Sequence, residues 1–324
     1  MKTMFSGMQP TGAPHVGNWL GALKNWVGLA KDYDSIFCIV DLHAMTVEYE
    51  PALLRERIRN LAAVFLASGL PAPEHCPLFV QSHVQEHTQL AWIFNTVTPM
   101  GELGRMTQFK DKAAQHAKNI NTGLFTYPLL QAADILLYKG EVVPVGEDQV
   151  QHIELARIVA RKFNNRFGEF FAEPKEIVTK GSRILGLDGK AKMSKRLGNH
   201  IEITEDPDSI RTKLKGAVTD PKRMRRSDPG DPSVCNMFTL HKHFSTPEQQ
   251  EWAASGCRAA GIGCFDCKKV LADNMIEQLA PIREKALDWI ARPKDLDDVL
   301  DQGAKACRAR AQKTMDGVRA LTGL

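Results

Sequence analysis

The chain lacks long hydrophobic runs, internal repeats and low-complexity stretches. A membrane-spanning helix needs roughly 20 consecutive apolar residues, and no run here approaches that length, so we expect no membrane span. The N-terminus begins directly with a strand pattern, so we expect no signal peptide and a cytoplasmic location. The net charge of +4 at pH 7 is small. It permits binding to nucleic acid but does not argue for it.

The composition is that of a globular protein with a sizeable core. The 324 residues are 43% hydrophobic and 25% charged, which is enough chain for two domains. There are seven cysteines, and a reducing cytosol should keep them from forming structural disulfides. Four of them lie between residues 235 and 267, and this clustering needs an explanation of its own.

Residues 4–18 have the layout of a nucleotide site. A short strand leads into a loop rich in glycine and proline at 7–14. Over residues 16–30 the apolar side chains recur at the spacing of one helix face. A helix start presents N–H groups and the positive end of its dipole to phosphate, and His15 and Asn18 could add side-chain donors. An ordinary first turn of an α/β domain is the alternative, and this stretch alone does not decide between them.

The first half of the chain alternates strands with helices. Strands separated by helices in this way indicate a parallel sheet with crossover helices. Beyond about residue 200 we find helical patterns and no clear strand. The short apolar runs that predict strands lie at 36–40, 78–81 and 141–145, and the helical spacings lie at 53–66, 127–138, 268–289 and 296–321.

The helix at 127–138 carries an acid among apolar residues. The neighbours of Asp134 on the helix surface are mostly apolar, so we expect its carboxylate to be at least partly buried and to need a donor or a cation. It could bond to the backbone in a structural role, or it could accept the N–H of a ligand. Upstream, His83 and His87 could form a metal-binding pair, but a polar helix start is the favoured interpretation there.

Two basic segments are candidates for binding phosphate. Residues 190–196 hold four cations in seven positions, between Gly189 and Gly198, and polyphosphate is a natural partner for such a loop. Residues 211–226 hold seven Lys or Arg against one acid, Asp220, and could follow a nucleic-acid backbone. A solvated charged segment is the alternative for both.

The clustered cysteines form a strong metal-binding pattern. Their spacing is Cys235-x21-Cys257-x6-Cys264-x2-Cys267. A C-x2-C pair can grip one metal centre and the other two can complete four thiolate ligands, a set that suits zinc or an iron–sulfur cluster. Four unrelated free thiols are the alternative.

Taken together, these motifs resemble the bacterial-type tryptophanyl-tRNA synthetases of class I along nearly the whole chain. The class has two signatures, His-Ile-Gly-His and Lys-Met-Ser-Lys-Ser. The first corresponds here to His15-Val16-Gly17-Asn18, and Asn18 is usual for the family. The second corresponds to Lys192-Met193-Ser194-Lys195-Arg196, in which Arg196 leaves both lysines intact. The other matching stretches are 5–12, 126–128, 132–136 and 143–149.

The resemblance implies a reaction in which the substrate carboxylate attacks the α-phosphorus of ATP. Lys192 and Lys195, helped by Mg²⁺, would neutralise the leaving pyrophosphate, and they would be the catalytic residues together with Gln9 and Asn18. The implied ATP-binding residues are Gln9, Pro10 and Thr11 along the cleft, Gly17 and Asn18 at the phosphates, Gly146, Glu147 and Asp148 at the ribose, Ile184 at the adenine, and Lys192, Met193, Ser194, Lys195 and Arg196 in the basic loop.

The resemblance gives Asp134 the role of accepting the indole N–H. Indole offers a donor and no acceptor, so a carboxylate fits it. A substrate without that donor leaves a buried polar group unpaired, which is how tyrosine and phenylalanine would be rejected. The other implied tryptophan-binding residues are Phe5, Gly7, His43, Val143, Val145 and Gln149.

Domains, cofactor and partners also follow from the resemblance. A doubly wound, Rossmann-like parallel sheet would form the catalytic domain over 1–185. An all-helical domain over 186–324 would read the tRNA anticodon and return its last helix to the catalytic domain. A subset of relatives has nearly the same cysteine spacing and binds a four-iron, four-sulfur (4Fe-4S) cluster, which we favour over zinc here. The implied metal ligands are Cys235, Cys257, Cys264 and Cys267, and the implied partners are ATP, L-tryptophan, tRNA(Trp) and a second copy of the chain in a homodimer.

Three rival functions can be weighed against this one. A tyrosyl-type synthetase would share the fold, but phenol recognition calls for a tyrosine or another donor beside the carboxylate, which Asp134 alone does not supply. A nucleic-acid-binding relative that has lost catalysis is disfavoured by the two intact lysines of the basic loop. A small nucleotidyltransferase is disfavoured by the long helical half.

Overall fold

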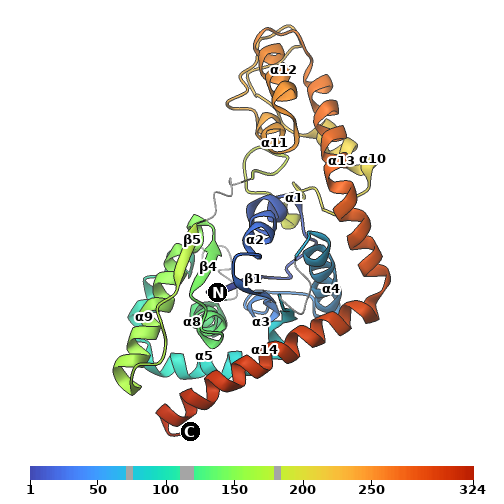
Figure 1. The fold of residues 1–324 in the computed structure, drawn as a ribbon. Coiled ribbons are helices and arrows are strands. Elements are labelled where there is room, and N and C mark those ends of the chain that lie inside the picture. Colours follow the sequence, from blue (N-terminus) through green and yellow to red (C-terminus); the bar gives the residue numbers. More distant parts are fainter. Residues whose placement is uncertain (71–75, 110–119, 179–183) are drawn as a thin grey trace.

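A five-stranded parallel sheet forms the centre of the molecule (Figure 1). The computed structural model describes residues 1–70, 76–109, 120–178 and 184–324. The strand order is β3-β2-β1-β4-β5, and each pair of neighbours is parallel, so the predicted fold class is confirmed. The strands are β1 (Thr3–Met8), β2 (Asp34–Ile39), β3 (Leu78–Val80), β4 (Val142–Val145) and β5 (Lys175–Val178).

Each face of the sheet has its own hydrophobic core. The helices over the two faces are α2 (Lys24–Leu29), α4 (Pro51–Ala67), α5 (Glu86–Val97), α8 (Thr122–Leu137) and α9 (Val150–Phe167). Alternate strand residues point to opposite faces. Met4 and Phe37 pack with α2 and α4, whereas Phe5 and Cys38 pack with α5, α8 and α9. In Figure 1, α2 lies above β1, whereas α8 and α5 lie below β1 and β4.

The segment after β1 follows the prediction except at its start. β1 includes Gly7 and Met8, which the sequence assigned to the loop. The predicted helix runs through α1 (Val16–Asn18), η1 (Trp19–Leu23) and α2, and η1 is π-helical. π-helical segments within helices are frequent at functional sites.

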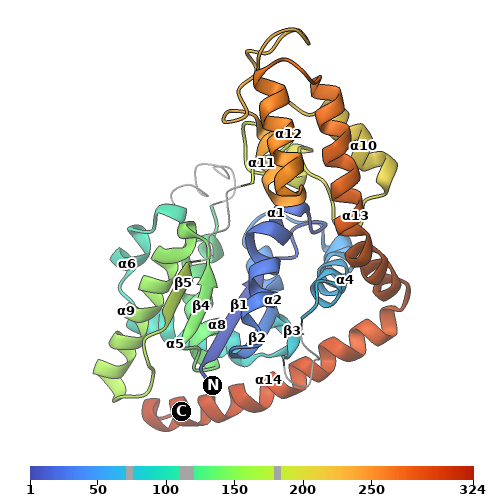
Figure 2. The same cartoon turned by 45° about the horizontal axis from the view of Figure 1, so that its top comes forward.

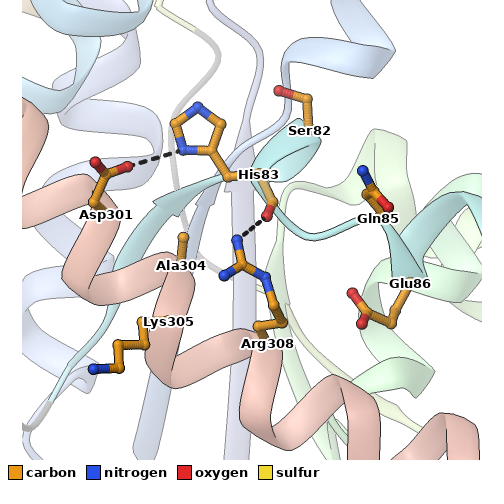
Figure 3. Close-up of a pocket in the computed structure, with 8 residues that line it drawn as sticks. All are labelled: Ser82, His83, Gln85, Glu86, Asp301, Ala304, Lys305 and Arg308. Carbon is orange, nitrogen blue, oxygen red and sulfur yellow. Dashed lines mark hydrogen bonds and ion pairs between the residues drawn. The ribbon is translucent and has the colours of Figure 1, made fainter.

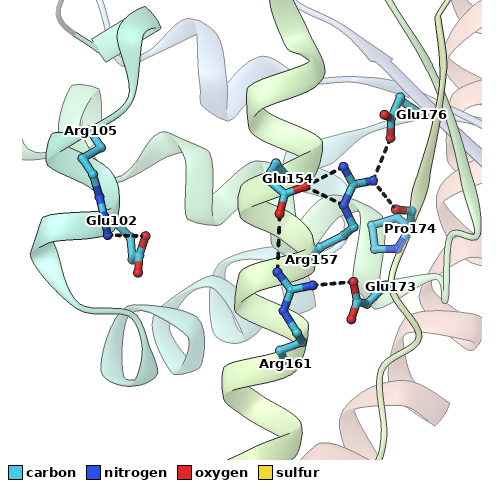
Figure 4. Close-up of polar contacts among 8 residues, drawn as sticks. All are labelled: Glu102, Arg105, Glu154, Arg157, Arg161, Glu173, Pro174 and Glu176. Atoms are coloured by element: carbon cyan, nitrogen blue, oxygen red, sulfur yellow. Dashed lines mark hydrogen bonds and ion pairs between the residues drawn. The ribbon is translucent and has the colours of Figure 1, made fainter.

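The edge strand β5 was missed by the sequence analysis, because its side chains are exposed or half-buried rather than apolar and buried. Arg157 of α9 connects to it: the guanidinium donates to Glu176 and to the carbonyl of Pro174, and also to Glu154 on its own helix (Figure 4). Arg161 adds a second ion pair to Glu154. Because these groups are partly exposed, each pair contributes at most about 1 kcal/mol.

The region beyond residue 200 is helical, as predicted. Its helices are α10 (Pro207–Gly216), α11 (Asn236–Phe244), α12 (Pro247–Arg258), α13 (Cys264–Ala291) and α14 (Pro293–Thr322). Figure 2 shows α11 and α12 beyond one end of the sheet, with α13 leading back toward α4. The domain boundary at residue 185 stays a prediction.

The last helix, α14, lies along the edge strand β3. The approach is so close that a Cβ atom on Gly303 would clash with the carbonyl oxygen of Leu78. The remaining short elements are α3 (Asp41–Ala44), η2 (Gln81–His83), α6 (Met100–Gly104), η3 (Glu147–Gln149) and η4 (Lys195–Leu197). Within the described ranges, none of the helices combines the length and apolar character that crossing a bilayer demands.

Candidate active site

The sheet topology places a switch point at the carboxyl ends of β1 and β4, which is where open α/β sheets have their ligand-binding crevice. β1 pairs with β2 on one side and with β4 on the other, so the chain turns in opposite directions after β1 and β4. Ligands of open α/β sheets bind at such a switch point. The predicted ATP-binding residues Gln9, Pro10 and Thr11 follow β1, and Gly146 follows β4 with exposed Glu147 and Asp148 after it.

The two signature segments, far apart in the sequence, touch each other. A Cβ atom on Gly12 would lie 2.9 Å from Cδ of Lys195, and one on Gly17 would lie 3.3 Å from Cβ of Met193. Glycine at these two positions therefore lets the basic loop lie against the loop after β1. Glu202 extends the contact, since its carboxylate is 3.9 Å from the Lys195 ammonium.

The basic loop is anchored by its apolar residue. Met193 is 2% exposed, and its N–H donates to the carbonyl of Ile184 at 3.0 Å. Ile184, predicted to lie at the adenine, is itself 3% exposed in this core. Ser194 is held by its N–H, which donates to Asn199 Oδ1 at 2.8 Å. The predicted cations Lys192, Lys195 and Arg196 are exposed around this anchor.

The helix start is less open than the sequence suggested. The N–H of Val16 donates to the carbonyl of Ile201 at 2.9 Å, and the N–H of Asn18 donates to His15 Nδ1 at 3.3 Å. The expectation of free N–H groups at this helix start is therefore wrong for these two residues. The carbonyl of Ile201, in the segment after the basic loop, accepts from Val16, and the His15 ring accepts from Asn18. The Asn18 side-chain oxygen accepts from the N–H of His15, which leaves the amide N–H groups of that side chain as donors.

His15 is neutral near physiological pH. Burial first, and then the charges of His200 and Lys192, lower the pKa of His15 to about 4. Because Nδ1 accepts from the backbone of Asn18, the proton is on Nε2. His15 can therefore donate one hydrogen bond from Nε2.

Asp134 is buried, as predicted, but not among apolar groups alone. It is 1% exposed, and its carboxylate has three side-chain partners: Gln81 Nε2 at 2.7 Å, His87 Nδ1 at 2.6 Å and His43 Nε2 at 2.9 Å. The predicted need for a donor is thus confirmed, and the donors come from η2, α5 and α3 rather than from the helix of Asp134. Burial alone would raise the pKa of Asp134, but the hydrogen bonds from His43 and His87 bring it below its usual value.

His87 is the functional candidate that the sequence analysis set aside. A polar helix start was favoured for His83 and His87, yet His87 is fully buried and contacts Asp134. Gln81 and Tyr138, which complete this polar group, carried no signal of their own. Their only clue was position, since Gln81 directly follows a strand and Tyr138 ends the helix of Asp134.

The other predicted tryptophan-binding residues lie on β1, β4 and η3. Phe5 stacks on Tyr138 with ring centroids 5.7 Å apart. Gly7 lies where a Cβ atom would come 2.9 Å from Val40. Gln149 lies in η3, and its amide donates to Asp148 at 2.9 Å. Val143 and Val145 are buried on β4.

The four clustered cysteines lie at the ends of three helices. Cys235 precedes α11, Cys257 is in the last turn of α12, and Cys264 and Cys267 are in the first turn of α13. Burial is the main cause that raises the pKa of Cys267 to about 12, and the nearby thiols of Cys235, Cys257 and Cys264 add to it. By their chemistry, four cysteine side chains are a donor set that suits a thiolate-ligated metal. Within the described residues, however, no three His, Cys, Asp or Glu side chains are arranged to hold one metal ion.

A separate cavity of about 830 Å³ lies between α14 and the segment from η2 to α5 (Figure 3). Arg308 of α14 donates to the carbonyl of His83 at 2.7 Å, and the His83 ring is 3.6 Å from Asp301. None of the predicted site residues lines this cavity. Its lining residues are Ser82, His83, Gln85, Glu86, Asp301, Ala304, Lys305 and Arg308.

Comparisons with known proteins show the family of the chain. Residues 1–280 match the family described as tRNA synthetases class I (W and Y). The tryptophan–tRNA ligase of Deinococcus radiodurans is 51% identical over 100% of this chain and 99% of its own length. That of Thermotoga maritima is 43% identical over 99% of both.

Solved structures give the same result. Tryptophanyl-tRNA synthetase from Campylobacter jejuni, complexed with ADP and tryptophan, superposes with a TM-score of 0.90 at 35% identity, covering 100% of both chains. Tyrosyl-tRNA synthetase from Aeropyrum pernix has a TM-score of 0.68 at 20% identity over 93% of this chain and 89% of its own, a likeness of fold alone. The chain therefore belongs to the class I tRNA synthetases for tryptophan and tyrosine. Within that class, the relatives at 43% and 51% identity place it among the tryptophan–tRNA ligases, so it is an aminoacyl-tRNA ligase.

Proposed function

We propose that this chain activates L-tryptophan with ATP to give tryptophanyl-AMP and then transfers the tryptophanyl group to tRNA(Trp). The observation that carries the proposal is the contact of Lys195 with Gly12, which joins the two signature segments beside the sheet crevice. The buried carboxylate of Asp134 supports it further, because its partners His43 and Gln81 follow the carboxyl ends of β2 and β3. The ligands of the Campylobacter jejuni relative, ADP and tryptophan, are consistent with both substrates.

In the first step a carboxylate oxygen of tryptophan attacks the α-phosphorus of ATP. The bond from that phosphorus to the bridging oxygen breaks, and pyrophosphate leaves. Lys192 and Lys195 are exposed beside the crevice and stabilise the charge that develops on the leaving group. Gln9 donates from the loop after β1, and Asn18 donates from the end of α1. Mg²⁺, bound with ATP, supplies further charge neutralisation.

Tryptophan is selected by one acceptor inside an apolar pocket. Asp134 accepts the indole N–H, and Phe5, Val143 and Val145 supply apolar walls. The side chain of phenylalanine has no donor, so it leaves a buried acceptor position unpaired. Tyrosine has an O–H donor, but at the end of a single ring and not at the position of the indole N–H, so in the proposed pocket it does not replace that hydrogen bond. Gly7, His43 and Gln149 complete the proposed pocket.

In the second step the terminal ribose hydroxyl of the tRNA attacks the carbonyl carbon of tryptophanyl-AMP, and AMP leaves. We assign anticodon recognition to the helical region beyond residue 186. Its segment 211–226 supports this role, since Lys222, Arg225 and Arg226 are exposed there and can contact phosphates. Because tRNA charging takes place in the cytoplasm, we assign the enzyme to that compartment.

We further propose that Cys235, Cys257, Cys264 and Cys267 hold a 4Fe-4S cluster rather than zinc. Four thiolates suit either group, and the side chains would have to turn toward one centre when it binds. Iron, labile sulfide and zinc are measured in protein purified without oxygen. Colourless protein with one equivalent of zinc would contradict the cluster. Cys264→Ser should weaken tRNA charging and spare adenylate formation, whereas loss of both would indicate a role in folding.

A homodimer is the proposed assembly. Trp92 on α5 and Met100 on α6 are 71% and 75% exposed, so both side chains are free to pack against a second copy of the chain. Sedimentation of the wild type and of Trp92→Glu checks this. A dimer that the substitution dissociates is expected, and a monomeric wild type would contradict the proposal.

The proposed reaction is tested by ATP–pyrophosphate exchange with tryptophan, tyrosine and phenylalanine in parallel, followed by charging of tRNA(Trp). We expect exchange with tryptophan alone. Exchange with tyrosine at a comparable rate would instead support the tyrosyl-type reading, and no exchange with any amino acid would support a relative without catalysis.

A further inference from the structure

The carboxylate of Asp134 is almost fully occupied by side chains of the chain itself. Oδ1 accepts from Gln81 Nε2 at 2.7 Å and lies 2.6 Å from His87 Nδ1. Oδ2 lies 2.9 Å from His43 Nε2. An ionised carboxylate offers about four acceptor positions, two on each oxygen. Both positions on Oδ1 are therefore taken, and one position on Oδ2 is left.

A second contact fixes the ring of His87. Its Nε2 lies 2.8 Å from the hydroxyl of Tyr138. Burial, before any nearby charge, raises the pKa of Tyr138 far above its usual value, so the phenol keeps its proton and can donate to Nε2. An ionised carboxylate has no proton to give, so His87 Nδ1 is the donor to Asp134. The hydrogen bonds thus run in one direction, from Tyr138 through His87 to Asp134.

This chain of hydrogen bonds is buried and tightly packed. His87 is 0% exposed and Tyr138 is 4% exposed. The Tyr138 ring stacks on Phe5 at 5.7 Å and meets the ring of Phe79 nearly at right angles at 5.8 Å. None of these rings can turn without losing packing, so the orientation of the Asp134 carboxylate is set before any substrate enters.

We propose that His87 and Tyr138 are positioning residues for substrate recognition: they hold Asp134 so that the one free acceptor position, on Oδ2, meets the indole N–H. The inference rests on the proposed function, because it concerns how the same pocket recognises its amino acid. Neither residue touches the substrate, and both act through Asp134.

Three variants separate this role from simple packing. His87→Leu removes the Nδ1 donor at similar volume, His87→Asn keeps an amide N–H near the position of Nδ1, and Tyr138→Phe removes only a hydroxyl. His83→Leu is the matched control, since His83 pairs with Asp301 and does not contact Asp134. For each, kcat/KM in ATP–pyrophosphate exchange is measured with L-tryptophan and with β-(3-benzothienyl)-L-alanine, in which sulfur replaces the ring N–H.

The readout is the ratio of the two kcat/KM values, which a general loss of structure would not change. We expect His87→Leu to lower the preference for tryptophan about tenfold and Tyr138→Phe about threefold, while His87→Asn and the control keep most of it. An unchanged ratio in both His87→Leu and Tyr138→Phe would overturn the inference. If His87→Leu does not fold, Tyr138→Phe decides alone. A wild type that fails to activate tryptophan would overturn the proposed function instead.

Discussion

Replacing Asp134 by asparagine should remove tryptophan activation and leave ATP binding intact. Asparagine has the same shape, but one carboxylate oxygen becomes an NH₂ donor. Two donors converge on Oδ1, at 2.7 Å from Gln81 and 2.6 Å from His87, so the amide oxygen takes that position. The amide nitrogen then takes the position of Oδ2. There it faces the indole N–H, and two donors cannot form a hydrogen bond with each other.

The size of the effect follows from the bonds that are lost. A hydrogen bond to a charged group contributes about 1.5–3 kcal/mol, and a buried donor left unpaired costs about 1–3 kcal/mol more. Together these terms should lower kcat/KM for tryptophan by roughly 100- to 10,000-fold. ATP–pyrophosphate exchange measures that loss, and equilibrium dialysis with ATP measures nucleotide affinity. A variant that activates tryptophan within threefold of the wild type would refute the reasoning.

The same variant makes a prediction about stability and pH. Although burial alone would raise it, the pKa of Asp134 is below its usual value because of the bonds from His43 and His87. A carboxyl with a lowered folded pKa stabilises the fold above its unfolded pKa of about 4. That contribution is lost as the pH falls through the folded pKa. The difference in unfolding free energy between wild type and Asp134→Asn should therefore be largest near neutral pH and shrink below about pH 4.

Three further substitutions test other parts of the molecule. Lys195→Ala should slow adenylate formation far more than it weakens ATP binding, as single-turnover rates and ATP dissociation constants would show. Gly303→Ala should lower the unfolding free energy by about 1–3 kcal/mol in urea titrations, because its Cβ would clash with Leu78. The control Gly28→Ala meets open space and should be neutral or slightly stabilising. His15→Asn should lose less stability than the wild type between pH 6.5 and 4, measured by urea unfolding at several pH values. Burial, and then the charges of His200 and Lys192, lower the pKa of His15 to about 4 in the folded protein. Between pH 6.5 and 4 the unfolded chain therefore binds a proton at His15 that the folded protein does not bind, which lowers the stability of the wild type.

The fold could be predicted from the sequence because it depends on local pattern, whereas only the family resemblance assigned the two signature segments to one ATP site. Hydrophobic runs and helical spacing identify β1 to β4 and the long helices. The strand β5 was not predicted, because an edge strand needs no continuous apolar run. Its two end residues, Lys175 and Val178, are exposed.

The partners of Asp134 could not be predicted, for a different reason. They lie 47, 53 and 91 residues away along the chain, so no local window contains them. The neighbours that a window does contain are those on the same helix, and these are apolar. His87 shows the same limit: its sequence context is a polar helix start, and only the packing of α5 on α8 buries it.

The helix α14 links the edge of the sheet to the proposed amino-acid pocket. β3 is an edge strand, and an uncovered edge exposes unpaired backbone groups. α14 covers it, with Gly303 against Leu78, and its Arg308 donates to the carbonyl of His83 (Figure 3). His83 lies between Gln81 and His87, which supply two of the three donors around Asp134. Loosening α14 should therefore disturb the proposed recognition of tryptophan, because it frees the segment that carries Gln81 and His87.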